Sequence, residues 1–327
     1  MHRESQVWGL SSVTALANEP VLSVVIPVRN EGDRLKAAVA SITAGRSDRF
    51  PLQIVLVDDN SSDDCCSGIA ESFSWHRDRV RVDVIRLPRW SGIPFARNAG
   101  AFAALAGILF ITDANVLFPL NWDLPIRQNI RENRVLCAAI SDMASSFRGY
   151  GCALRIPSMG VSWLRHPGQH GGYVPVAPCA ATILPAELFR RAGGYDTALP
   201  VYGAAEPEFS VRLWLAGAEI LSIPDLVLRH RFRPDRERRP FLDAIGRIQL
   251  YNYLRFGMLY LDRPRIMQML RHYKIQSPML LEEAVRGLNS SDVWHRRNLL
   301  EQRLPLRFQS FVDRFDLRDA YGQLAHS

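Results

Sequence analysis

The chain has 327 residues, of which 47% are hydrophobic and 22% are charged, and its formal net charge is +7 at pH 7. This composition is typical of a folded globular protein and argues against a disordered chain, a collagen-like repeat or a disulfide scaffold. The positive charge would suit a phosphate-bearing ligand, an anionic surface or nucleic acid. No zinc-finger, leucine-zipper or aromatic RNA-binding pattern accompanies the charge, so we expect no nucleic-acid partner.

The cysteines and the apolar segments bear on where the protein resides. The five cysteines form an odd set without a Cys-x-x-Cys pair, which fits reduced thiols better than a disulfide framework. Residues 1–20 lack the basic stretch and apolar run of a secretory signal. The most apolar segment, residues 99–111, is only about 13 residues long, too short to span a bilayer. The sequence therefore predicts a cytoplasmic protein without a transmembrane segment, and leaves peripheral membrane contact open.

Strand and helix patterns alternate through the first third of the chain. Apolar β-branched runs predict strands, and apolar residues at helical spacing after polar turns predict helices. The predicted strands are residues 22–28, 52–57, 80–87 and 108–112, and the predicted helices are residues 35–42, 65–73 and 93–106. Alternation at this spacing favours an α/β fold with a mostly parallel central sheet flanked by helices.

The second half of the chain is less regular. Residues 147–176 have six glycines and no clear period, so we expect a long loop that could serve as a lid or an acceptor-binding loop. We then expect helices at 185–192 and 206–215, a strand at 219–223, and mostly helix beyond Pro240. These patterns predict one catalytic domain over residues 1–240 and a helical C-terminal extension over residues 241–327.

Polar clusters directly follow three of the predicted strands, at residues 29–31, 58–60 and 113–115. The carboxyl ends of parallel strands meet at one edge of the sheet, and ligands of open α/β sheets bind there. The sequence therefore places the functional site at this edge.

Four segments in this order resemble glycosyltransferase family 2. They are SVVIPVRNE (23–31), IVLVDDNSSDD (54–64), ARNAGA (96–101) and FITDAN (110–115). Two later segments, residues 202–233 and 252–262, are more similar to the polypeptide N-acetylgalactosaminyltransferases, a related branch. The resemblance extends from about Val21 to Asp262. It implies a GT-A (Rossmann-like) fold and a nucleotide-diphosphate sugar donor, with UDP as the expected nucleotide.

The resemblance also implies roles for individual residues in donor binding. Asp59 corresponds to the acid that reads the uracil ring and ribose, and Arg97 to an arginine that contacts the base. The first loop, with Pro27, Arg29 and Glu31, lies beside the expected donor pocket. Arg231 and Arg233 follow His230 in an arginine-rich segment, and their guanidinium groups would suit the diphosphate.

A divalent cation is the cofactor that the resemblance implies, because the leaving diphosphate develops negative charge. Oxygen ligands suit Mg²⁺ or Mn²⁺. The Asp-x-Asp or Asp-x-His motif of the family corresponds here to Asp113-Ala114-Asn115, and a third ligand is implied at His230. An amide at position 115 brings no charge, so we expect weaker metal affinity than with two acids.

The acceptor base is expected on the segment Ala205-Glu206-Pro207-Glu208, which occupies the place of the family's acidic pair. An inverting enzyme needs a carboxylate within hydrogen-bond reach of the acceptor hydroxyl. Glu206 is the first candidate and Glu208 the second, although either carboxylate could serve only to stabilise the N-terminus of a helix. In a retaining enzyme Glu206 would position substrate without acting as a base.

The sequence leaves the acceptor open, and a peptide or protein, a small molecule and a glycan are all compatible with it. Asn115, Ala205 and the Cys179-Ala180 pair, which stands where the family has Gly-Gly, favour an alternative: a nucleotide-sugar-binding protein without catalysis. A nucleotidyltransferase fits poorly, because the loop at residues 29–33 is not glycine-rich. The helical end could cover the site or pair two subunits, so a homo-oligomer is also an expectation.

Overall fold

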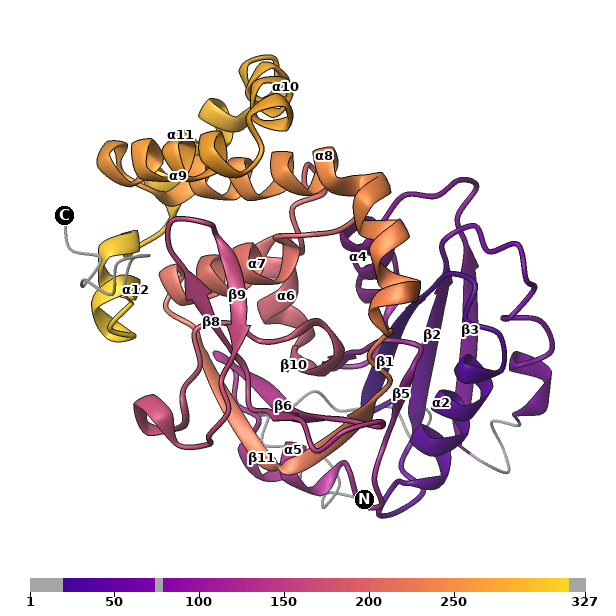
Figure 1. Cartoon of the computed structure of the whole chain (residues 1–327). Coiled ribbons are helices and arrows are strands. Elements are labelled where there is room, and N and C mark those ends of the chain that lie inside the picture. The colour runs from indigo at the N-terminus through magenta and orange to yellow at the C-terminus, as the bar shows by residue number, and fades with distance from the viewer. Residues whose placement is uncertain (1–19, 74–78, 318–327) are drawn as a thin grey trace.

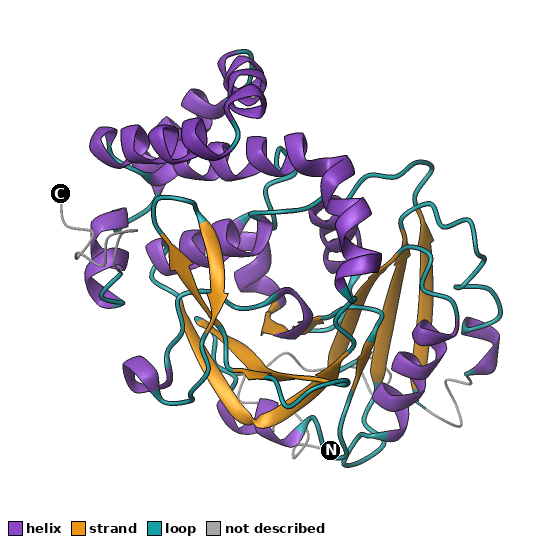
Figure 2. Ribbon diagram, in the orientation of Figure 1, coloured by secondary structure: helices purple, strands orange, loops and turns teal. Residues whose placement is uncertain are grey.

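The computed structural model describes residues 20–73 and 79–317. The prediction that residues 1–20 carry no secretory signal therefore lies outside the described residues except at Pro20. The described part consists of a curved, mixed sheet with helices packed on both faces and a group of helices across one end (Figures 1 and 2).

The strands and helices of the described residues follow in chain order. The strands are β1 (Leu22–Val28), β2 (Leu52–Asp58), β3 (Val80–Arg86), β4 (Ile108–Ile111), β5 (Val116–Leu117), β6 (Arg134–Asp142), β7 (Arg148–Gly149), β8 (Cys152–Arg155), β9 (Gly160–Trp163), β10 (Thr182–Pro185) and β11 (Glu219–His230). The α-helices are α2 (Asp33–Ala44), α4 (Ile93–Ala103), α5 (Leu124–Asn129), α6 (Ala186–Ala192), α7 (Ala205–Leu215), α8 (Asp235–Tyr260), α9 (Arg263–Gln276), α10 (Pro278–Asn289), α11 (Val293–Arg303) and α12 (Phe308–Arg314).

The main sheet of the described residues has nine strands, with the order β3-β2-β1-β4-β10-β6-β11-β5 and with β7 paired to β6. The first four strands of this order are parallel, as the sequence predicts. The strand β10 is antiparallel to both of its neighbours, whereas β6 and β11 are parallel to each other. The expected parallel sheet is therefore confirmed for one half, and the other half is mixed.

The region at residues 147–176 is more ordered than predicted. It contains β7, β8 and β9, and the last two form a separate antiparallel pair. These strands have two to four residues each, too short for an alternating pattern to stand out. Gly149 is required here because a Cβ at that position would collide with the ring of Trp163. The prediction of a long loop was therefore wrong where these three strands lie, within residues 148–163.

Other differences from the predictions concern the lengths of elements. The predicted strand at 219–223 continues to His230 through an irregularity between Ile223 and Val227. The predicted helix at 65–73 is reduced to a turn and the short 3₁₀ segment at residues 70–72. The strands β6 and β10 were not predicted.

The hydrophobic core lies on both faces of the main sheet and continues into the C-terminal helices. One cluster of buried side chains extends from Val25 on β1 to Leu317 at the end of the described chain. A hydrogen bond of 2.6 Å from the Tyr260 hydroxyl on α8 to Glu208 Oε1 on α7 joins the same two regions. The predicted boundary at residue 240 falls within α8, and it stays a prediction.

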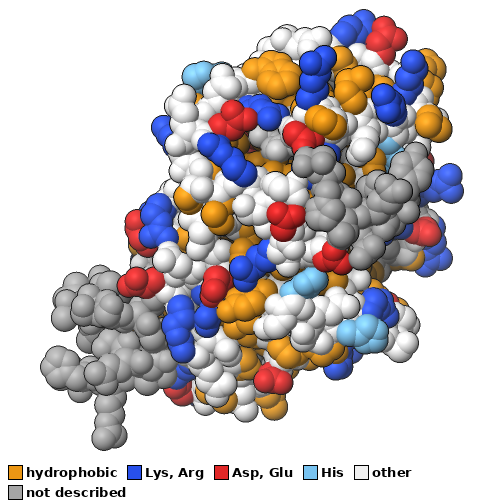
Figure 3. All heavy atoms as spheres, turned by 90° about the vertical axis from the view of Figure 1, so that its left-hand side faces the viewer, with side chains coloured by type: hydrophobic (Ala, Val, Ile, Leu, Met, Phe, Trp, Pro, Cys, Tyr) orange, Lys and Arg blue, Asp and Glu red, His pale blue; other side chains and the backbone are white. Residues whose placement is uncertain are grey.

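Two further features of the described residues are the distribution of charge on the surface and the character of the helices. On the face drawn in Figure 3, Lys and Arg side chains are interspersed with Asp and Glu side chains. None of the helices in residues 20–73 and 79–317 combines the length and the apolar character needed to cross a membrane.

Candidate active site

The carboxyl ends of β1, β2 and β4 bring the predicted polar clusters to one edge of the sheet. Asp59 follows β2 and is 3% exposed. Its two carboxylate oxygens accept hydrogen bonds from the backbone N–H groups of Ser91 (2.7 Å) and Gly92 (2.8 Å), immediately before α4. Asp59 therefore ties the end of β2 to the start of α4. A carboxylate can accept further bonds, so its predicted contact with the nucleoside stays a prediction.

The loop that follows β1 packs against the loop that follows β2, next to Asp59. Pro27 lies on β1, and Arg29 follows that strand and donates hydrogen bonds to the backbone oxygens of Asp59 (2.6 Å) and Asn60 (2.9 Å). The guanidinium of Arg29 also stacks over the ring of Trp90 at 4.9 Å. Trp90 is 42% exposed. Its exposed ring beside Asp59 offers a stacking surface at the edge of the sheet.

Arg97 on α4 links two carboxylates of the site. Its side chain is 1% exposed, and its Nη1 lies 2.5 Å from Glu206 Oε1 while its Nη2 lies 3.1 Å from Asp113 Oδ1. Burial alone would raise the pKa of Asp113, but the adjacent His230 and Arg97 together lower it to about 2. Asp113 is therefore a carboxylate at neutral pH. Arg97 holds both acids in place, and its predicted contact with the base stays a prediction.

His230 approaches Asp113 from the end of β11, and Asn115 lies in the turn before β5. His230 Nε2 is 3.8 Å from Asp113 Oδ2, and the Nδ1 atom of His230 is buried without a hydrogen-bond partner among the described residues. The Asn115 side chain donates to the backbone oxygen of Arg231 (2.9 Å), so its amide holds the residue that follows His230. Two of the predicted metal ligands, Asp113 and His230, therefore lie together, whereas the Asn115 amide contacts the backbone of Arg231. The role of each as a ligand stays a prediction.

The donor set around Asp113 can be tested against a divalent cation. Neighbouring donors of an octahedral ion at about 2.1 Å are about 3.0 Å apart. The separation of Asp113 Oδ2 and His230 Nε2 is 3.8 Å, so these two groups would have to move closer together to bind one Mg²⁺ or Mn²⁺ ion. Within the described residues, His, Cys, Asp and Glu form no group of three that could hold a metal. Any ion here would depend on ligands from the substrate or from water.

The two candidate base residues differ sharply in their surroundings. The Glu206 side chain retains 16% exposure at the N-terminus of α7, next to Arg97. Glu208 is fully buried, and its oxygens accept from Arg212 (2.9 and 2.8 Å) and from Tyr260 (2.6 Å). A carboxylate that is fully buried and already occupied cannot take a proton from an acceptor. We therefore revise the expectation for Glu208 to a structural role.

The arginines after β11 pair with acids from other elements. Arg233 Nη2 is 2.6 Å from Glu31 Oε1, so the first loop is joined to the segment between β11 and α8. Glu31 is 7% exposed and also accepts from Arg34 (2.9 Å). Both predicted donor-binding residues, Arg233 and Glu31, thus lie together. Their ion pair would have to rearrange for Arg233 to contact a diphosphate.

Several residues of the site were not identified from the sequence. Ser91 and Gly92 hold Asp59 with backbone groups, which a side-chain pattern cannot reveal. Cys179, which the sequence marked only as a departure from the family's Gly-Gly pair, contacts Asp113 Oδ2 through its sulfur at 3.4 Å. Asn252 on α8 contacts the loop at residues 200–204, which leads into α7.

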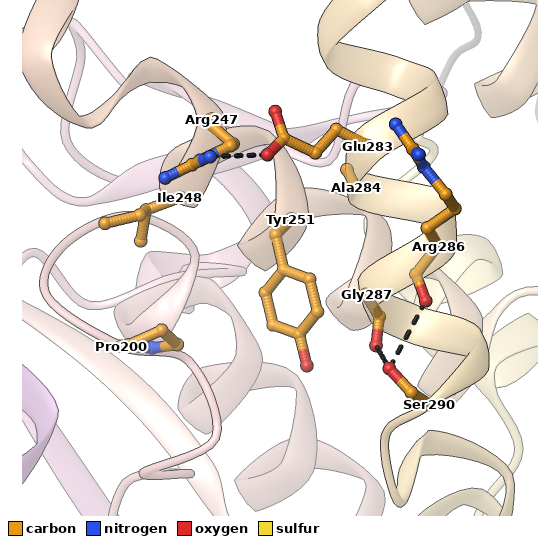
Figure 4. Close-up of a pocket in the computed structure, with 9 residues that line it drawn as sticks. All are labelled: Pro200, Arg247, Ile248, Tyr251, Glu283, Ala284, Arg286, Gly287 and Ser290. Carbon is orange, nitrogen blue, oxygen red and sulfur yellow. Dashed lines mark hydrogen bonds and ion pairs between the residues drawn. The ribbon is translucent and has the colours of Figure 1, made fainter.

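A separate cavity of about 540 Å³ lies between α8, α10 and Pro200 (Figure 4). The Tyr251 ring points between Pro200 and Gly287, and Gly287 lets the backbone of α10 approach that ring closely. None of the predicted site residues lines this cavity.

Comparison with known proteins bears on the family and the fold of the chain. Residues 23–166 match the family model described as glycosyl transferase family 2. N-acetylgalactosaminyltransferase 6 of Drosophila melanogaster is 28% identical over 268 residues, which cover 76% of this chain and 39% of the relative. Polypeptide N-acetylgalactosaminyltransferase 11 of Xenopus tropicalis is 27% identical over 266 residues, which cover 74% of this chain and 43% of the relative. The chain thus matches about two fifths of the length of these relatives.

A solved structure of GalNAc-T7 with UDP, GalNAc and Mn²⁺ has a similar fold. The TM-score is 0.69 at 21% sequence identity, and the match covers 90% of this chain and 56% of that chain. Together these findings confirm the resemblance read from the sequence: residues 23–166 match the family 2 glycosyltransferase model, and the chain has a fold similar to that of GalNAc-T7.

Proposed function

We propose that the protein is a glycosyltransferase that moves a sugar, in the first instance N-acetylgalactosamine, from a UDP-linked donor to an acceptor. The observation that carries this proposal is the cluster at the carboxyl edge of the sheet. There, buried Arg97 joins Asp113 and Glu206, with His230 next to Asp113. The names of the relatives and the UDP and GalNAc of the similar structure support the choice of donor.

The donor side of the proposal rests on the loops after β1 and β2. Asp59 would accept hydrogen bonds from the nucleoside, with Trp90 and Arg29 at the edge of the pocket and Arg97 behind it. Arg233 would exchange its partner Glu31 for the diphosphate, because a guanidinium group matches phosphate geometry.

A divalent cation, Mn²⁺ or Mg²⁺, would be held by Asp113 and His230, with Asn115 as a neutral third candidate. When bound, such an ion neutralises the charge that develops on the leaving diphosphate. The Mn²⁺ of the similar structure supports this assignment. Because these protein ligands are few, the proposal implies that the metal ion binds weakly without the nucleotide and that the nucleotide binds weakly without the metal ion.

On the acceptor side, Glu206 would take the proton of the acceptor hydroxyl while a bond forms between that oxygen and the anomeric carbon. The bond from the anomeric carbon to the diphosphate breaks, and UDP leaves. Arg97 orients the Glu206 carboxylate through Oε1. If the reaction retains configuration, the same residue positions the acceptor without taking its proton.

The acceptor is proposed to be a peptide or protein, because the relatives are named polypeptide transferases. A small molecule or a glycan would be an alternative outcome of an acceptor screen. The same proposal includes a cytoplasmic location, which the five free cysteines of the structure support.

A second candidate is a binding protein that holds the nucleotide-sugar without turnover. The specific observation in its favour is Asn115, whose amide holds Arg231 and brings no charge to the metal site.

The proposal is tested by thermal shift against UDP, GDP, dTDP and CDP, with and without Mn²⁺. A ligand that binds the folded state raises the melting temperature by mass action. We expect stabilisation by UDP with Mn²⁺ and much less by UDP alone, and we expect Asp113→Asn to remove the effect of Mn²⁺. Glu187→Gln, an exposed acid on α6, is the control. No shift with any nucleotide would overturn the proposal.

A further inference from the structure

The loop at residues 200–204 connects both halves of the candidate site, and two elements hold it in place. On one side, Val201 pairs with Gly92, and the Ile93 N–H donates to the Val201 oxygen (2.9 Å). On the other side, the amide nitrogen of Asn252 donates to the backbone oxygens of Pro200 (2.8 Å), Tyr202 (3.0 Å) and Gly203 (3.2 Å). The loop then enters α7, where Glu206 is the second residue.

The backbone of this loop is strained. Val201 has φ 62° and Ala204 has φ 64°, a region that side chains other than glycine rarely adopt, and least of all β-branched ones. Conformations of this kind persist only where the surroundings hold them, and they gather at functional sites. The contacts from Gly92 and Asn252 supply that support.

The side-chain amide of Asn252 has its nitrogen bonded to the loop and its oxygen unpaired within the described part of the chain. The residue is 0% exposed, and its Oδ1 atom is buried without a partner among the described residues. Turning the amide over would give the oxygen no donor on the loop and would set it against three carbonyl oxygens. A leucine would fill a similar volume without a buried polar atom, and a buried acceptor without a partner is costly. The presence of an amide at this buried position is therefore explained by its hydrogen bonds to the backbone of the 200–204 loop.

We propose that Asn252 is a positioning residue for the acceptor side of the active site. By holding the 200–204 loop, it fixes the start of α7 and so the place of Glu206. The helix α8 then contributes to the geometry of the active site through Asn252, in addition to packing against it. This inference rests on the proposed function for its kinetic consequences, but the fixing of the loop can be measured without any activity.

The test compares Asn252→Leu with Met269→Ala in the full-length protein. Met269 is a fully buried residue of α9 that packs on Gly257 of α8, so its truncation loosens the same helical region at another place. Hydrogen exchange followed by mass spectrometry should show peptides over residues 199–206 exchanging about tenfold faster in Asn252→Leu only. Equal exchange of these peptides in the two variants would overturn the inference.

Kinetics give the second readout. Asn252→Leu should lower kcat for transfer by about 10- to 100-fold, because misplacement of a catalytic group costs about this much. The KM for the UDP-sugar should stay within about twofold, because Asp59 keeps its own contacts with Ser91 and Gly92. A kcat unchanged from wild type, or one lowered equally in Met269→Ala of matched stability, would overturn the positioning role. Wild-type protein without any turnover would contradict the proposed function and leave the exchange result to decide the inference.

If Asn252→Leu does not fold, Gly203→Ala perturbs the same contact from the loop. Gly203 has φ 100°, and a Cβ there would come within 3.0 Å of Gln249 on α8. The same faster exchange and lower kcat are expected, and normal values for both would contradict the inference.

Discussion

Arg97 is the residue on which the geometry of the proposed site depends most. Its buried guanidinium separates two carboxylates that would otherwise face each other, Asp113 and Glu206. Removal of one member of a buried ion pair leaves an uncompensated charge and costs about 3–5 kcal/mol. We expect Arg97→Ala to lower the free energy of unfolding by about this amount in urea denaturation.

Arg134→Ala is the matched control for that experiment. Arg134 pairs with Glu219, but the two side chains are 24% and 41% exposed, so the pair is worth less than about 1 kcal/mol. Similar losses in the two variants would show that Arg97 contributes no more than a surface pair does.

The revised role of Glu208 predicts a pH dependence of stability. Burial would raise the pKa of Glu208, but Arg212 and Tyr260 together lower it below its usual value of 4.5. The stabilisation from this lowered pKa is present above pH 4.5 and is lost as the pH falls toward the folded-state pKa. We expect Glu208→Gln to lose about 3 kcal/mol at pH 7. Its free energy of unfolding should also fall less steeply than that of wild type below pH 4.5.

Urea denaturation between pH 7 and pH 3 measures both effects. Parallel curves for wild type and Glu208→Gln would contradict the assignment of a lowered pKa to this residue.

At the scale of elements, the turn before α4 joins the nucleotide side of the site to the 200–204 loop. Gly92 has φ 88°, and a Cβ there would overlap the backbone of Val201. We expect Gly92→Ala to destabilise the fold by about 2–3 kcal/mol. UDP affinity, measured calorimetrically with Mn²⁺, should fall about tenfold or more because the two N–H groups on Asp59 are displaced.

Gly68→Ala is the control for the conformational part of that effect. Gly68 also has a positive φ, 70°, but a Cβ there would meet nothing within 4 Å. Loss of UDP affinity in both variants alike would contradict a specific role for the turn before α4.

Burial made some strands predictable from the sequence but not all of them, because β6 and β10 are also buried and were not predicted. The strands β1 and β2 are buried over their whole length and read as continuous apolar runs, so they were predicted to within a residue. The strands β8 and β9 have four residues each and lie partly at the surface, so no such run marks them. The clustering of Asp59, Asp113 and the Glu206 segment followed from strand ends and the resemblance. The contacts made by Asn252 and Gly92 did not, because they depend on which backbone groups the fold brings near.

At the scale of the whole molecule, the sheet region and the C-terminal helices share one core. Buried side chains from Leu250 to Leu317 belong to the same cluster as those of β1 and α7. Glu208 is also bonded to Tyr260 across this junction. We therefore expect a fragment of residues 1–240 to unfold without a cooperative thermal transition, as followed by circular dichroism. A cooperative transition close to that of the full chain would support the predicted boundary at residue 240 as a true domain boundary.

The most direct test of the account is the release of UDP from UDP-N-acetylgalactosamine in the presence of Mn²⁺. We predict slow release by the wild-type protein and faster release when an acceptor peptide is added. Asp113→Asn should be lower by about 100-fold or more, which corresponds to about 3 kcal/mol of transition-state stabilisation. Glu187→Gln should match the wild type. Release that is absent with every UDP-sugar, or equal in Asp113→Asn and wild type, would contradict the account.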